Sequence, residues 1–176
     1  MNDDGLWERC AAFHGHICGG LAIGYKAAVY AARALGLRFS KDEELVCIAE
    51  NDACGIDAIQ VALGCTLGKG NLLFHITGKQ AFSFYDRASG ASLRLCLRDR
   101  PAGMGKEESL RYLLEREPEA LFKASPATLP LPEKASIFAG RACAGCGETV
   151  AESQLVICAD GAFCKDCRRP YDRFRV

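Results

Sequence analysis

Apolar residues recur at helical spacing in the first part of the chain. Leu6 and Cys10 would share one face of a short helix within residues 1–12. From Leu21 to Leu35, apolar side chains return every three or four positions, which predicts a longer helix, and Gly36 is suited to end it. The chain therefore begins with two predicted helices.

Short apolar or alternating runs follow and predict strands. Leu45–Ala49 is a continuous apolar run of the length of a buried strand. Three more runs, at 72–77, 80–86 and 92–98, are separated by glycine-containing turns and predict an antiparallel meander. In the last run leucines alternate with polar residues and cysteine, as in a sheet with one buried side.

The pattern changes twice more before the C-terminus. Residues 106–123 are again helical in pattern, with a break or restart at Pro118. Residues 125–134 hold three prolines and no periodicity, which is typical of an extended linker. We expect an α+β core domain over 1–124, with an antiparallel sheet flanked by helices, then a linker over 125–136 and a small module over 137–176.

That module has the cysteine spacing of a zinc finger. Cys143, Cys146, Cys164 and Cys167 form C-x2-C-x17-C-x2-C, which fits a four-thiolate zinc site better than a redox site. A hairpin at Asp160-Gly161 and a short helix from Cys164 would make it a treble-clef or ribbon-like finger. Zinc would replace the hydrophobic core that some 40 residues cannot build.

Composition narrows the partners. The 22 acidic residues balance 22 lysines and arginines, so net charge favours neither nucleic acid nor membrane. The basic and aromatic tail from Lys165 to Arg175 leaves nucleic acid open as a partner, beside a protein or dimer contact. With no signal-peptide pattern or long apolar run, and with paired C-x-x-C motifs, we expect a cytoplasmic protein without a membrane span.

A second group of candidate ligands lies near the N-terminus, in FHGHICGG. His14, His16 and Cys18 alternate, so an extended backbone would direct all three to one face. Cys18 directly precedes the predicted second helix, whose positive end favours thiolate over thiol. Imidazole and thiolate are transition-metal ligands, and two of the three histidines fall in this segment, which indicates a functional site.

Polar residues also gather after the first predicted strand, in ENDACGIDAIQ. Cys54 falls in the first turn of a predicted helix, where its thiolate would be favoured for the same reason as that of Cys18. Helical offsets of three place Asp57 and Gln60 near Cys54. The alternative is that Asp57 and Gln60 belong to a solvated helix face.

The segment GCTLGKGNL is rich in glycine and carries Lys69 and Asn71. It lacks the G-x-x-x-x-G-K-[ST] pattern of a phosphate-binding loop. It either brings Lys69 or Asn71 to a cofactor pocket or forms an ordinary turn.

Together FHGHICGGLAIGYKAA, ENDACGIDAIQ and GCTLGKGNL resemble the FmdE family of formylmethanofuran dehydrogenase proteins, in the version with a C-terminal treble clef. Gly19 stands where that family has proline. The resemblance implies a homodimer associated with a molybdenum or tungsten enzyme of one-carbon metabolism. It places His14, His16 and Cys18 in a first site and Cys54 in a second, lining a common cleft suited to zinc or another transition metal.

Three functions fit these observations. The first is a metal-binding accessory protein whose cleft of His14, His16, Cys18 and Cys54 binds a metal or small ligand. The second is a metal-dependent enzyme with Cys18, Cys54 and Asp57 as candidate catalytic residues, and with His14 as another proton carrier. The third is a ligand-sensing regulator whose finger binds nucleic acid or protein.

Overall fold

The computed structural model describes residues 5–169 and 173. The chain divides into two compact units, Met1–Ala135 and Ser136–Val176, here called the core unit and the finger unit. Each unit is described by itself.

The core unit contains the helices that the apolar spacing predicts. Cys18 precedes α2, and Gly36 ends it with φ 64°, a left-handed conformation that suits glycine. Within the described ranges no helix has the length and apolar character to cross a membrane. The helices are α1 (Leu6–His14), α2 (Gly19–Leu35), α3 (Gly55–Leu63), α4 (Lys106–Glu115) and α5 (Pro118–Leu121).

A five-stranded sheet has the order β2-β1-β3-β4-β5. The meander prediction is wrong for β2, which pairs in parallel with β1 through the crossover helix α3; the other pairs are antiparallel. The predicted helical segment at 106–123 also ends early, and its last residues begin β5. The strands are β1 (Leu45–Ala49), β2 (Leu72–Phe74), β3 (Ala81–Asp86), β4 (Ser92–Leu97) and β5 (Phe122–Ser125).

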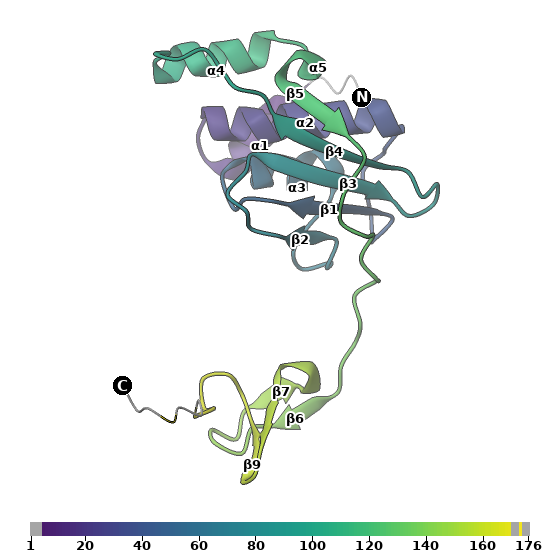
Figure 1. Ribbon diagram of the computed structural model, residues 1–176, viewed down its shortest axis with the longest axis vertical. Coiled ribbons are helices and arrows are strands. Elements are labelled where there is room, and N and C mark those ends of the chain that lie inside the picture. The colour runs from purple at the N-terminus through teal and green to yellow at the C-terminus, as the bar shows by residue number, and fades with distance from the viewer. Residues whose placement is uncertain (1–4, 170–172, 174–176) are drawn as a thin grey trace. The chain divides into compact units, whose positions relative to one another are not determined.

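The main hydrophobic core lies between the helices and one face of this sheet. In Figure 1, α1, α2 and α3 lie on the same side of the strands. Phe82, Phe84 and Leu95 from the strands are fully buried with Leu21 and Ile59 from the helices. The fold is therefore α+β, with a mixed sheet covered by helices.

The proline-rich segment covers part of the other face. Val46, Ile48 and Tyr85 form a small buried cluster that Ala127 and Leu129 cover. The Tyr85 hydroxyl donates a hydrogen bond to the Leu129 carbonyl oxygen at 2.7 Å. The apolar side chains that separate the prolines thus bury sheet residues.

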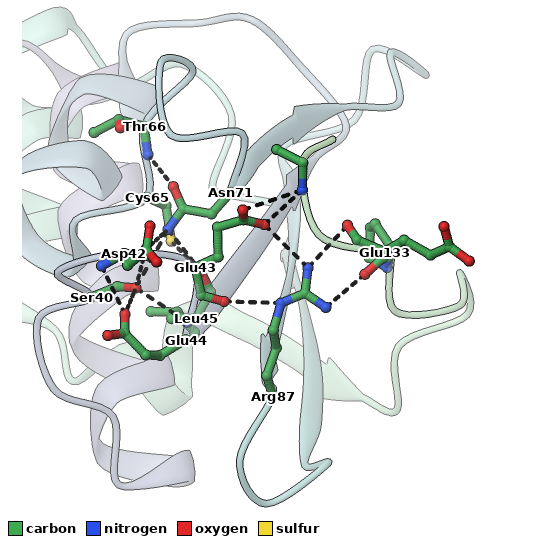
Figure 2. A network of polar contacts seen from close by, with 12 residues as sticks. Ser40, Asp42, Glu43, Glu44, Leu45, Cys65, Thr66, Asn71, Arg87 and Glu133 are labelled. Carbon is green, nitrogen blue, oxygen red and sulfur yellow. Dashed lines mark hydrogen bonds and ion pairs between the residues drawn. The ribbon is translucent and has the colours of Figure 1, made fainter. Parts of the chain in front are cut away.

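Arg87 holds the end of the same segment (Figure 2). Its guanidinium donates to the Pro132 carbonyl oxygen at 2.8 Å and to the Glu133 carbonyl oxygen at 3.1 Å. The Glu43 carboxylate accepts a hydrogen bond from the Ala135 backbone N–H at 3.1 Å. Residues 126–135 are extended, as the composition predicts, but they belong to the core unit, which ends at Ala135 where the sequence suggested residue 124.

Helices α2 and α3 cross with their backbones in contact. A Cβ atom added at Gly24 would lie 1.9 Å from the Gly55 carbonyl oxygen, so only glycine fits there. One turn earlier, a Cβ at Gly20 would lie 3.1 Å from the Cys54 Cβ. The crossing therefore brings the beginnings of α2 and α3 together.

The finger unit consists of two short hairpins. In place of the predicted helix from Cys164, residues 165–167 form a turn, and residues 170–172 lie outside the described part. Strands β8 and β9 form the hairpin that Asp160-Gly161 predicts. The elements are β6 (Gly140–Ala142), β7 (Thr149–Ala151), the 3-10 helix η1 (Glu152–Gln154), β8 (Val156–Cys158) and β9 (Gly161–Phe163).

Candidate metal centres

Three side chains converge at the junction of α1 and α2. The ligand atoms of His14, His16 and Cys18 all lie within 4.8 Å of one another. The predicted extended backbone is wrong, because His14 ends α1 and Gly15 then turns the chain with φ 86°. A helix end, a turn and a helix start thus bring together the residues that the alternating pattern singled out; we call them the core cluster.

Asp57 orients the core cluster from α3. The His14 Nδ1 atom lies 2.7 Å from Asp57 Oδ2, and His14 Nε2 lies 3.8 Å from Cys18 Sγ. Gln60 Nε2 donates to the other Asp57 oxygen at 3.2 Å. A carboxylate on one imidazole nitrogen fixes the ring and its tautomer, which leaves the other nitrogen for a metal.

Cys18 and Cys54 lie beside the α2–α3 crossing. Cys18 Sγ accepts a hydrogen bond from the Leu21 backbone N–H at 3.3 Å, as expected for a residue that caps α2. A Cβ at Gly20 would lie 3.6 Å from Cys54 Sγ and 3.8 Å from Cys18 Sγ. Cys54 is therefore next to the core cluster, although it is not among the three residues whose ligand atoms converge.

The expected thiolate at Cys54 is wrong. Burial and the neighbouring Cys18 raise the pKa of the Cys54 thiol, so these two causes outweigh the start of α3. A bound cation next to the sulfur would act in the opposite direction.

Lys69 and Asn71 hold the backbone around the start of β1 (Figure 2). Lys69 Nζ donates to the Ser40 carbonyl oxygen at 2.7 Å. Asn71 is fully buried; it donates to the Leu45 carbonyl oxygen at 2.9 Å and accepts from the Thr66 N–H at 2.9 Å. Cys54, by contrast, follows the end of β1. The structure thus gives both side chains a role in the loop and does not bring them to the core cluster.

The four cysteines of the finger unit form the second cluster, here called the finger cluster. The sulfurs of Cys143, Cys146, Cys164 and Cys167 lie within 4.8 Å of one another, so they could bind a metal ion. Cys143 Sγ accepts backbone hydrogen bonds from Cys164 and Gly145, both at 3.3 Å. The Cys164 N–H, followed by the other backbone donors, lowers the pKa of Cys143 to about 6. Such N–H···S contacts favour the thiolate that a metal requires.

A cavity of about 500 Å³ opens beside the core cluster. His16 and Cys18 line it from the α1–α2 junction, and Lys106 and Ser109 line it from α4. A small molecule in this cavity would therefore touch two members of the core cluster. The sequence did not indicate α4 as part of the site, because Lys106 and Ser109 form no motif with the cysteines.

Comparisons with known proteins agree with this architecture. The crystal structure of an FmdE-like protein of tungsten formylmethanofuran dehydrogenase, from Syntrophus aciditrophicus, matches with a TM-score of 0.66 and 25% identity, over 91% of this chain and 88% of that one. A probable S-adenosyl-L-methionine-binding protein from Archaeoglobus fulgidus is 28% identical over 94% of this chain, which spans 53% of that relative's length.

The family comparison covers most of the core unit. The model described as FmdE, molybdenum formylmethanofuran dehydrogenase operon, matches residues 13–129. This range includes the core cluster, Cys54, Asp57 and the first residues of the proline-rich segment. The chain belongs to the FmdE family.

Proposed function

We propose that the chain is a metal-binding accessory protein of a molybdenum or tungsten formylmethanofuran dehydrogenase. In this proposal the core cluster binds a transition metal, and the finger cluster binds a structural zinc. The observation that carries the proposal is the 2.7 Å contact between His14 Nδ1 and Asp57, because it orients an imidazole toward Cys18 and His16.

The donor set fits zinc or another borderline transition metal. Two imidazoles and one thiolate are ligands that such ions prefer, and three protein ligands leave a coordination position open. The cavity of about 500 Å³ beside His16 and Cys18 has room for a small molecule at that position. When bound, the metal would act as a Lewis acid toward such a ligand.

Metal analysis of purified variants tests the two clusters separately. Cys18→Ala should remove the core metal and keep the finger zinc, whereas Cys143→Ala should do the reverse. Cys96→Ala is the matched control, because Cys96 is half-buried in β4 and outside both clusters. Two metals per chain in Cys18→Ala protein would contradict the core site.

The association with a dehydrogenase needs its own experiment. We expect the chain, as a homodimer in the cytoplasm, to co-purify with a molybdenum- or tungsten-containing enzyme from its native cells. Light scattering of the purified chain measures the homodimer independently. A monomer that co-purifies with no such enzyme would contradict the accessory role.

A second candidate function is thiol-based catalysis. Cys18, His14 and Asp57 stand in the order of nucleophile, base and orienting carboxylate, with 3.8 Å and 2.7 Å between successive groups. Turnover of formyl or thioester substrates by metal-free protein, abolished by Cys18→Ser, would support this function over the accessory role.

A further inference from the structure

A second cavity adjoins the one beside the core cluster. It measures about 400 Å³ and is lined by Gln80, Arg98 and Arg100, among others. Ser109 lines both cavities. A ligand longer than a few atoms could therefore extend from Cys18, past Ser109, to the two arginines.

Three cations line these walls, and none of them pairs with an acid in the described part of the chain. Arg98, Arg100 and Lys106 form no ion pair within 4 Å there, whereas the arginines at 33, 87, 94 and 141 all do. Arg100 is oriented by donating to Ser109 Oγ at 2.7 Å. Asp99 and Glu107 also line the cavities, so cations exceed acids by three to two.

Two further groups await a ligand there. Helix α4 begins after Gly105, which supplies no side-chain cap, so N–H groups of its first turn point to solvent beside Lys106. Gln80 Oε1 is buried and has no hydrogen-bond partner in the described part of the chain. A buried acceptor without a donor destabilises the fold, and a ligand hydroxyl or amide would offset that loss.

We propose that the two cavities form one binding groove for a small molecule with an anionic tail, a carboxylate or a phosphate. Its reactive end lies at the core cluster, and its tail lies against Arg100 and Lys106 beside the start of α4. Guanidinium and helix N–H groups both match the oxygens of such an anion. This inference rests on the proposed function, because it assumes a metal at the core cluster.

Calorimetric titration of the zinc-loaded protein with three alkyl hydroxamates tests the groove. The hydroxamate end binds zinc in each compound, and tails of equal length end in a carboxylate, a phosphonate or a neutral carboxamide. We expect about tenfold tighter binding of at least one anionic compound than of the carboxamide, the gain typical of a charge-assisted hydrogen bond. The tighter of the two anions identifies the tail.

Variants assign the effect to the groove. Arg100→Gln and Lys106→Gln should each remove most of the preference for the anionic tail while the metal content stays at two ions per chain. Arg38→Gln is the matched control, because this exposed arginine lines a different cavity. Equal affinity for all three compounds, or a preference that survives both variants, would overturn the groove and leave the metal site standing. Failure of every hydroxamate, together with an absent core metal, would overturn the proposed function itself.

Discussion

The core cluster and the finger cluster present similar ligand atoms in opposite surroundings. Around the core cluster, α1, α2 and α3 are packed against a sheet, and Asp57 holds His14 in place. Within the described finger residues only Cys143 is buried, and Ile157 is 79% exposed. We therefore expect the finger to depend on a metal for its fold, whereas packing holds the core cluster.

The ligand count points the same way. Four sulfurs complete a tetrahedral site, which is typical of structural zinc. Two imidazoles and one thiolate next to a cavity leave a position for a small molecule. Removing the metal, the packing, the orienting carboxylate and a remote ion pair in turn tests this contrast.

The largest effect should follow removal of the finger metal. Structural zinc sites of this kind bind with about 10–16 kcal/mol, which is most of the folding free energy of so small a unit. We expect Cys143→Ala, or chelation, to unfold residues 136–169 while the core unit stays folded, as measured by limited proteolysis and amide NMR. Cys158→Ala is the control; a finger that stays protease-resistant without metal would break the comparison.

Gly24→Ala tests whether packing positions the core cluster. The added Cβ would meet the Gly55 carbonyl oxygen at 1.9 Å, so α2 and α3 must move apart. We expect a loss of about 3 kcal/mol in the free energy of unfolding, measured in urea, with weaker core metal binding and an unchanged finger. Gly68→Ala serves as control, since nothing lies within 4 Å of its Cβ position.

Asp57→Asn should weaken the core metal alone. Loss of a carboxylate that orients a ligating histidine typically costs about 10–100-fold in metal affinity, and we expect that range in a competition titration. The finger zinc should be unaffected. Asp52→Asn in the same segment is the control, because Asp52 is exposed; equal affinities of both variants would remove Asp57 from the site.

The smallest effect concerns Glu50, which belongs to neither cluster. Arg94 Nε donates to Glu50 Oε1 at 2.6 Å, and this bond, with that from Thr77, lowers the pKa of the carboxyl group. A lowered native pKa stabilises the fold above the unfolded value of about 4.3, and this stabilisation is lost as pH falls through the native pKa.

Glu50→Gln should therefore cost about 1.5 kcal/mol at pH 7 and make the acid side of the core unfolding curve less steep. Urea unfolding between about pH 3 and 7 measures both effects, on either side of the unfolded pKa. The exposed Glu108→Gln change should leave the curve as it is. An unchanged acid limb in Glu50→Gln protein would show that the ion pair contributes nothing.

Periodicity and motif spacing predicted much of this molecule. The helix that ends at Gly36, the buried strand at 45–49 and the Asp160-Gly161 hairpin follow from local patterns. The cysteine spacing anticipated the convergence of the four finger sulfurs, because a short C-x-x-C turn determines where its sulfurs point.

Features that depend on distant contacts were not predictable. The parallel pairing of β1 and β2 depends on where α3 packs, which no pattern in 72–77 encodes. The Pro-rich residues resembled a linker because Ala127 and Leu129 show no period, yet they cover a specific cluster. Asp57 was noted for its spacing from Cys54, but its partner His14 lies 43 positions away.

The glycine crossing of α2 and α3 also has a kinetic consequence. Because Gly24 and Gly55 let the two backbones touch, the spacing of the helix starts that carry Cys18 and Cys54 is set by main-chain contact rather than by side-chain rotamers. A metal arriving at the core cluster needs little chain ordering, so its uptake should be one bimolecular step whose rate rises linearly with metal concentration. Uptake by the finger, which must collapse around its ion, should instead reach a limiting rate set by the chain.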